Sequence, residues 1–270
     1  MEAQQKKKLN FDYRMELTYG DLVHRAFFTI KGVPQSNARQ QISDIDITMS
    51  PWVDWSEGRD SFGNLQIYGC ITEPHDHFIF HISGEAAVGE NPWEEAADEN
   101  LLPLYRYPYG MNRAGSCITE YYESLKEHLA GSPYENAVFL MHQLHRDFQY
   151  RQYVTDLTTG AEEAWELGGG VCQDYVHIFL ALCHLAGIPA RYVTGLITGE
   201  GASHAWAEIC DRGKWYGLDP TNDIPAGESH VKIGHGRDAS DCPINRGILL
   251  GGGEQYQKIL VTVAEEETIW

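Results

Sequence analysis

The chain has 270 residues, enough for one large domain or two of ordinary size, and its hydrophobic content of 43% is typical of globular proteins. Its 39 acidic and 20 basic residues give a formal net charge of −19. Such a surface repels phosphate backbones and anionic lipid headgroups, so we expect neither a nucleic-acid partner nor a membrane partner.

Targeting and redox features favour a cytoplasmic location. The basic residues Lys6–Lys8 are not followed by the apolar stretch of a signal peptide. The longest apolar run, His177–Ile188, is too short to cross a membrane and contains His184. The six cysteines include no closely spaced pair, which in a chain without an export signal favours reduced thiols over disulfides.

Strands are predicted throughout the first third of the chain. Apolar and polar residues alternate, or short apolar runs lie between turn residues, in the segments 11–19, 26–30, 40–49, 65–69 and 77–88. Strands at this spacing, separated by turns such as Lys31–Pro34, are typical of an antiparallel β-sandwich. We therefore predict a β-sandwich domain over residues 1–88.

Residues 89–115 show no hydrophobic period and are punctuated by Pro92, Pro103 and Pro108. We interpret them as a linker or irregular wrap between two domains. Within this segment, Leu101–Tyr105 is apolar enough to pack against a neighbouring element.

Helices come next, and antiparallel strands follow them. Helices are predicted over 119–130, 133–148, 161–167 and 172–185, the second of them starting with the capping pattern Ser132-Pro133-Tyr134-Glu135. Strands are predicted at 190–198, 203–210, 214–218, 231–234 and 258–265. Helices followed by antiparallel strands are typical of an α+β fold, and we assign residues 116–270 to one core domain.

A single cysteine marks the start of the helix predicted at 172–185. Cys172 follows three glycines, Gly168–Gly170, and therefore lies in the first turn. Unpaired backbone N–H groups and the positive end of the helix dipole stabilise a thiolate there, and the thiolate is the reactive form. A buried structural thiol fits this stretch alone equally well, so the choice depends on which residues lie near Cys172 in space.

A predicted hairpin carries a histidine and an aspartate. His204 lies in its first strand, Asp219 lies at the end of its second, and a turn near 211–213 joins the two. With a two-residue loop at Asp211 and Arg212, the histidine lies directly across from the aspartate on the same face of the sheet. A three-residue loop would put the two side chains on opposite faces.

These three residues form a coherent set for acyl transfer. Cys172 is the candidate nucleophile, and His204 is the base that accepts its proton and later protonates the leaving amine. Asp219 orients the imidazole, and the expected intermediate is a thioester. The backbone N–H of Cys172 is one candidate donor to the oxyanion. Further candidates for the oxyanion or the substrate are Gln149, Tyr150, Trp165 and Gln173.

Three motifs lie in order along the second half of the chain. They are Gly170-Val171-Cys172-Gln173-Asp174, Ser203-His204-Ala205-Trp206 and the segment Trp215–Asn222. Together they resemble the motifs of the transglutaminase-like cysteine-protease superfamily. The resemblance implies a papain-like core, in which the helix of the cysteine packs on an antiparallel sheet that bears the histidine and the aspartate.

The resemblance extends to bacterial members of that superfamily. These have a β-rich N-terminal region with a motif like Asp60-x-x-Gly63-Asn64. They also have a tail like Val231-x-x-Gly234-x-Gly236-Arg237-Asp238-x-x-Asp241-x-Pro243. The chain departs from this pattern at Cys242, where an apolar residue is expected.

The resemblance leaves the reaction open, because similar cores hydrolyse amides, transfer acyl groups to amines or are inactive. The leading hypothesis is thiol-dependent hydrolysis of an amide or peptide bond, with a protein or peptide as substrate. The first alternative is a protein-glutamine or other amine acyltransferase with the same triad, and the second is a binding module without activity. The chain has no nucleotide, flavin or nicotinamide motif, so we expect no cofactor.

Two other features carry weaker hypotheses. His75, His77 and His81 share strand parity and could present a metal site on one face. No fourth ligand is evident, so an exposed histidine-rich face is favoured and we assign no metal ligand. Cys242 is favoured as a buried structural thiol over a redox partner of Cys172.

Overall fold

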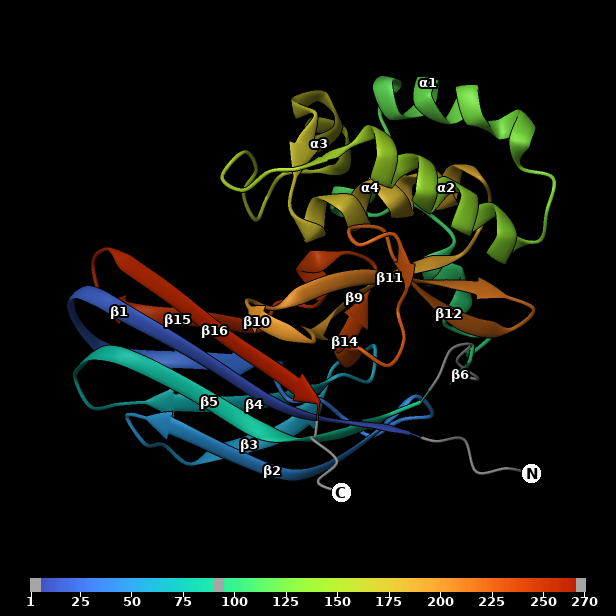
Figure 1. Ribbon diagram of the computed structural model, residues 1–270. Coiled ribbons are helices and arrows are strands. Elements are labelled where there is room, and N and C mark those ends of the chain that lie inside the picture. Colours follow the sequence, from blue (N-terminus) through green and yellow to red (C-terminus); the bar gives the residue numbers. More distant parts are fainter. Residues whose placement is uncertain (1–5, 90–94, 266–270) are drawn as a thin grey trace.

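The computed structural model describes residues 6–89 and 95–265, and these form an α+β fold. A curled antiparallel sheet makes up one part of the molecule, and a six-stranded sheet covered by helices makes up the other (Figure 1). The predicted α+β class is therefore confirmed. None of the described helices is both long enough and apolar enough to cross a membrane.

The first sheet is built around one long strand, β1 (Lys7–Ile30). The first half of β1 lies between β5 and β16, and its second half lies between β4 and β15. β2 pairs with β5, and β3 pairs with β4. The bounds of these strands are β2 Gln40–Ser50, β3 Trp55–Arg59, β4 Leu65–Ile71, β5 His75–Val88, β15 Asn245–Gly251 and β16 Gln255–Glu265.

A bend in β1 turns this sheet into two facing layers. The register between β1 and β5 shifts between Thr18 and Val23. Beyond the bend, Phe28 of β1 packs on Phe78 of β5, with ring centroids 5.0 Å apart. The strands predicted at 11–19 and 26–30 are thus one strand that contributes to both layers of the predicted sandwich.

The last two strands correct the prediction for the end of the chain. We predicted that 258–265 completes the strands of the core domain, but β16 pairs with β1 from Leu9 opposite Glu265 to Tyr19 opposite Gln255. Residues assigned to the core at 116–270 therefore complete the first sheet. The cause is that alternating hydrophobicity identifies a strand and its buried face but does not identify its partner.

The second part contains a sheet with strand order β13-β12-β11-β9-β14, and β6 pairs with β12. All of these pairs are antiparallel. The bounds are β6 Glu95–Ala96, β9 Ala190–Ile197, β11 His204–Asp211, β12 Lys214–Asp219, β13 Ile224–Pro225 and β14 His230–Gly236. Between β9 and β11, the short strand β10 (Gly199–Gly201) crosses over to pair with β16 of the first sheet.

Among the described residues, four α-helices lie in this second part, and they cover its sheet (Figure 1). They are α1 Ser116–Leu125, α2 Pro133–Asp147, α3 Ala161–Leu167 and α4 Cys172–Leu185. α4 is the central helix, because residues 174–183 are all buried between the other helices and strands β9 and β11. The capping box predicted for α2 is confirmed: the Ser132 hydroxyl accepts the backbone N–H of Glu135, and the Glu135 carboxylate accepts that of Ser132.

The predicted wrap between the domains lies against the core sheet where it is described, from residue 95 onward; Pro92 lies outside the described residues. It contains two 3₁₀ helices, Leu102–Tyr105 and Gly110–Asn112. Tyr105 is buried and packs edge-on against Trp215 of β12, with ring centroids 5.4 Å apart. The expectation that Leu101–Tyr105 packs on a neighbouring element is confirmed.

The two motifs noted for bacterial members contact each other across the two parts. The Asn64 side-chain amide pairs with the backbone of His235, donating to its carbonyl at 2.7 Å and accepting from its N–H at 2.9 Å. Lys31 donates to the Asp60 carboxylate at 2.7 Å and to the carbonyl of Asp241 at 2.8 Å. These bonds join the β3–β4 turn to the end of β14, and Lys31 links the same turn to the segment that follows β14.

Candidate active site

Cys172 is the first residue of α4, as predicted. The chain reaches it through a parallel pair of two-residue strands, β7 (Gln149–Tyr150) and β8 (Gly169–Gly170). The Asp174 carboxylate caps the helix by accepting the backbone N–H of Val171 at 2.7 Å. Because Cys172 is the first helical residue, its own N–H has no acceptor within the helix and is available to an oxyanion.

Local geometry explains the glycines at positions 168 and 170 before Cys172. Gly168 ends α3 with a φ of 70°, in the left-handed region that other residues rarely adopt. A Cβ at Gly170 would lie 2.3 Å from an Asp174 carboxylate oxygen. The glycines therefore set the turn and make room for the cap of α4.

The hairpin of β11 and β12 has a two-residue turn, but it lies one residue later than predicted. Arg212 and Gly213 form it with φ values of 48° and 74°, and a type I′ turn requires positive φ at both central positions. The cross-strand register consequently moves by two residues. An even shift preserves which face each side chain occupies, so His204 and Asp219 remain on the same face.

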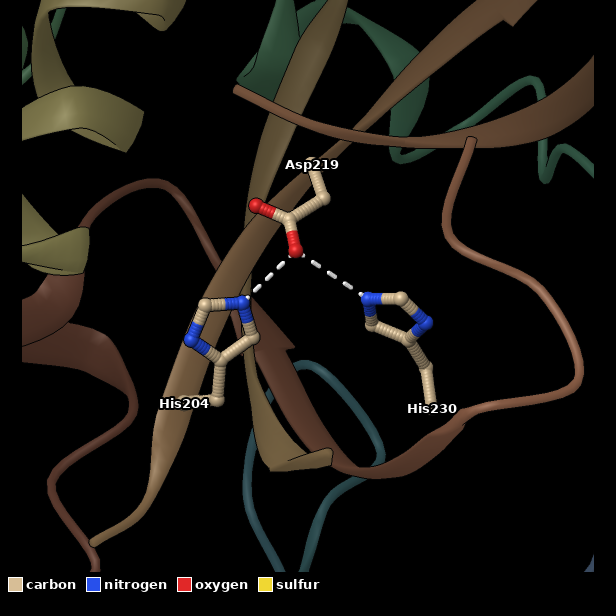
Figure 2. Close-up of side chains that lie close together, drawn as sticks. All are labelled: His204, Asp219 and His230. Carbon is tan, nitrogen blue, oxygen red and sulfur yellow. Dashed lines mark hydrogen bonds and ion pairs between the residues drawn. The ribbon is translucent and has the colours of Figure 1, made fainter. Parts of the chain in front are cut away.

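The structure brings the three predicted residues together. His204 Nε2 lies 2.8 Å from Asp219 Oδ2 (Figure 2). With Nε2 engaged by the carboxylate, Nδ1 is the ring nitrogen left for the Cys172 thiol, which contacts His204 and lines the same cleft. The catalytic role of the three residues stays a prediction.

The Asp219 carboxylate is fully buried and surrounded by donors. Oδ1 accepts the backbone N–H groups of Thr221 at 3.0 Å and Asn222 at 3.2 Å, and Oδ2 accepts the Asn222 side-chain amide at 2.7 Å. His230 Nε2 lies 3.2 Å from Oδ2 (Figure 2). Burial opposes ionisation, but hydrogen bonds from His204 and His230 hold the pKa of Asp219 well below its usual range.

His230 and Asn222 were not predicted as site residues. Each lies next to a feature that the sequence showed: His230 directly precedes the tail motif that starts at Val231, and Asn222 is the last residue of the Trp215–Asn222 motif. Their approach to Asp219 depends on how β14 and the loop after β12 fold back. The spacing of residues in the sequence does not predict this approach to Asp219.

The surroundings of His204 favour its charged form. Burial opposes the imidazolium, but hydrogen bonds to Asp219 and to Cys172 outweigh burial and raise the pKa of His204 to about 10. The His204 imidazolium can therefore pair with a cysteine thiolate. This ion pair is the reactive form of a thiol next to a histidine.

One of the four further candidates, Tyr150, lines the cleft with Cys172. Trp165 packs in the helical layer, 4.4 Å from Tyr121 and 6.1 Å from Phe148 between ring centroids. The position of Trp165 therefore does not support its predicted role as an oxyanion donor.

The other two candidates make local contacts. The Gln149 side-chain oxygen accepts a hydrogen bond from Arg151 Nε at 3.1 Å. The Gln173 amide donates to the carbonyl of Leu157 at 3.4 Å. Gln152, which was not predicted, lines the cleft instead.

The cleft at Cys172 has a volume of about 620 Å³ and lies where the first sheet meets the core. Cys172, His204 and Tyr150 line it from the core, while Gly199–Gly201 of β10 and Val261 of β16 line it from the first sheet. Tyr150 is the only phenylalanine, tyrosine or tryptophan among the described residues that line it.

The remaining sequence hypotheses concern residues away from this cleft. His75, His77 and His81 each have a separate polar contact, with no shared ligand set among the described residues. The contacts are the Glu73 carbonyl, the Asp76 carboxylate and the Asp12 carboxylate, respectively. Cys242 is buried, and burial raises the pKa of its thiol well above the usual range, in line with a structural role.

Trp206 packs beside both histidines of the site. Its ring stacks near His204, with centroids 6.4 Å apart, and meets His230 edge-on at 5.1 Å. Gly195 on β9 provides the space: a Cβ there would lie 2.3 Å from the Trp206 ring and 2.4 Å from the carbonyl oxygen of Val231. The glycine therefore leaves room for the ring that packs against both histidines.

Gly195→Ala is expected to destabilise the protein by about 2 kcal/mol, because the added methyl group must displace either the Trp206 ring or the backbone of β14. Urea denaturation measures the loss. The matched control is Gly247→Ala, a strand glycine whose Cβ would make no contact closer than 3.5 Å. Equal midpoints for the two variants would show that the crowding at Gly195 is not real.

Comparison with known proteins identifies the family. Residues 123–220 match the transglutaminase-like superfamily, and residues 9–87 match the bacterial transglutaminase-like N-terminal region. The chain belongs to the transglutaminase-like superfamily. The predicted resemblance is thereby confirmed, and the superfamily match contains Cys172, His204 and Asp219.

Relatives of this transglutaminase-like protein cover most of its length. An uncharacterised protein of Mycobacterium leprae (strain TN) is 38% identical in an alignment of 257 positions that covers 85% of this chain and 88% of that protein. An uncharacterised protein of Mycobacterium tuberculosis (strain ATCC 25618 / H37Rv) is 29% identical in an alignment of 280 positions that covers 90% of this chain and 87% of that protein.

A solved structure shares the fold over nearly the whole chain. It is described as a candidate cysteine protease from Cytophaga hutchinsonii, and the TM-score is 0.79 over 98% of this chain and 92% of that chain. The sequence identity is 20%, so the likeness is one of fold.

Proposed function

We propose that this transglutaminase-like protein is a thiol-dependent hydrolase of amide or peptide bonds. The observation that carries the proposal is the arrangement at the cleft: a cysteine at a helix start, a histidine with a raised pKa and a buried carboxylate bonded to that histidine. Each group is placed for one step of acyl transfer.

The proposed reaction proceeds through a thioester. The Cys172 thiolate attacks the carbonyl carbon of the substrate, and the backbone N–H of Cys172 donates to the oxygen that becomes negative. The His204 imidazolium gives its proton to the leaving amine, which departs as the thioester forms. His204 then accepts a proton from water, which attacks the thioester and releases the acid, while Asp219 holds the imidazole.

The lining of the cleft favours water over an amine as the second reactant. An acyltransferase is expected to bind its amine in a tunnel with aromatic walls beside the nucleophile. Here the described residues of the cleft include glycines, serine and threonine, and Tyr150 alone supplies a large aromatic ring. The exposed strand Gly199–Gly201 offers its backbone to an extended chain, which supports a peptide as the substrate.

The test is a peptide-library digest, with and without a primary amine, with Cys172→Ala as the blank. We expect cleaved peptides with new carboxyl ends and no amine adduct. Amine adducts as the main product would make the protein an acyltransferase. Cleavage by Cys172→Ala would exclude the thiol mechanism, and a Cys172 that resists iodoacetamide at neutral pH would favour a binding module.

A further inference from the structure

We propose that His230 is a positioning residue of this site. Its neutral imidazole donates a hydrogen bond to Asp219 and holds the carboxylate in the orientation that His204 requires. This role in catalysis rests on the proposed function. The effect of His230 on the protonation of His204 can be measured without a substrate.

The hydrogen bonds of His230 fix its tautomer. The ring is buried at the start of β14, between Asp219 and a turn. The backbone N–H of Gly227 points to Nδ1 at 3.3 Å, so Nδ1 is an acceptor. The proton of the neutral ring is therefore on Nε2, which lies 3.2 Å from Asp219 Oδ2 (Figure 2). The Ser229 hydroxyl also lies within hydrogen-bonding distance of Nδ1, at 3.0 Å.

The charged groups around His230 keep it neutral. Burial lowers its pKa, and nearby positive charge on His204 and Arg39 opposes a further proton, although the Asp219 carboxylate favours one. The two imidazoles on Asp219 thus differ: the pKa of His204 is raised and that of His230 is lowered. One imidazole exchanges protons with the thiol, and the other is a fixed donor.

The same geometry argues against a metal site. Donor atoms of His204, Asp219 and His230 lie within 4.8 Å of one another, which is a spacing that a metal ion could bridge. Both Nε2 atoms, however, lie at hydrogen-bonding distance from the same oxygen, 2.8 and 3.2 Å, and a zinc ion needs each nitrogen about 2.0–2.1 Å from itself. Trp206 packs against both imidazole rings in this arrangement.

The two histidines therefore have different roles at the Asp219 carboxylate. A fully buried carboxylate needs several donors to remain ionised, and removal of the donor at His230 weakens the hold on Oδ2 and makes protonation of the carboxylate easier. Either change weakens its bond to His204. The imidazolium is then less stable, and the thiolate at Cys172 loses its partner.

The experiment compares His230→Gln, whose longer amide can still donate to Asp219, with His230→Asn, whose shorter amide cannot, and with His230→Leu. Two quantities are measured against pH: the iodoacetamide alkylation rate of Cys172, and the titration of His204 by NMR. For Asn and Leu we expect alkylation at neutral pH to fall about tenfold and the pKa of His204 to fall. For Gln we expect both to stay near wild type.

A merely structural role would lower the melting temperature without moving the His204 titration. The matched control is His75→Leu, which removes a buried imidazole from the first sheet. Three results would overturn the proposal: a wild-type titration curve in His230→Asn, equal effects of Gln and Asn, or the same titration shift in His75→Leu. If no peptide is cleaved but His230→Asn still moves the titration, the hydrolase assignment fails and the positioning role stands.

Discussion

Asp219→Asn is expected to lower the rate of the Cys172-dependent reaction about 10⁴-fold while the fold is retained. The asparagine amide can donate to His204 Nε2, which then becomes an acceptor and carries no proton. Nδ1 would hold the proton and point it at the thiol, so His204 could not accept the proton of Cys172. The loss of negative charge also lowers the pKa of His204. The measurement is kcat/KM on a cleaved peptide together with the alkylation rate of Cys172.

The matched control for this substitution is Asp223→Asn. Asp223 pairs with His142 at 2.5 Å on the surface, so it offers the same chemical change in an aspartate–histidine pair outside the site. We expect its activity to stay within about twofold of wild type. A loss of less than tenfold in Asp219→Asn would contradict the role of the carboxylate.

The pair also makes the stability of the protein depend on pH. Asp219 has a folded-state pKa below its ordinary 3.8, so its contribution is present above that pH and is lost as the pH falls. His204 has a folded-state pKa of about 10 against 6.5, so its contribution is complete below pH 6.5 and is lost as the pH rises toward 10. The stability difference between wild type and Asp219→Asn is therefore expected to be greatest between these two ordinary values, and urea denaturation at several pH values measures it.

Glu208→Gln is expected to lower the free energy of unfolding by about 3 kcal/mol or more. Glu208 is completely buried in β11 and pairs with Arg39, with Arg191 Nε at 2.7 Å and with Lys232 Nζ at 2.8 Å. These charges keep the pKa of Glu208 well below its usual range although burial opposes ionisation. After the substitution, Arg191 and Lys232 keep their pairs with Glu95, but the negative charge of Glu208 no longer balances the buried cations around it.

A double variant keeps this prediction testable if Glu208→Gln does not fold. Glu208→Gln with Lys232→Met removes one cation along with the carboxylate, so we expect it to recover part of the lost stability. The surface control is Glu123→Gln, which breaks an exposed pair with Lys126 and is expected to have little effect. A midpoint of urea unfolding unchanged in Glu208→Gln would show that the cluster contributes no stability.

The sequence by itself determined the class of fold, the family and the three residues of the candidate triad. Cys172 could be placed at a helix start because glycines and an apolar helix flank it, and the structure has it there. His204 and Asp219 could be placed on one face because strand parity survives a register error of two residues. Local period and turn chemistry carry this kind of information, since both act over a few residues.

Only the tertiary structure decided which distant segments meet. The pairing of β16 with β1, the docking of Asn64 on His235 and the approach of His230 to Asp219 each join residues that no local pattern connects. The cluster of Glu208 with Arg39 is of the same kind. Such contacts follow from how whole sheets pack and from the need of buried polar groups for partners, and these conditions act on the folded chain as a whole.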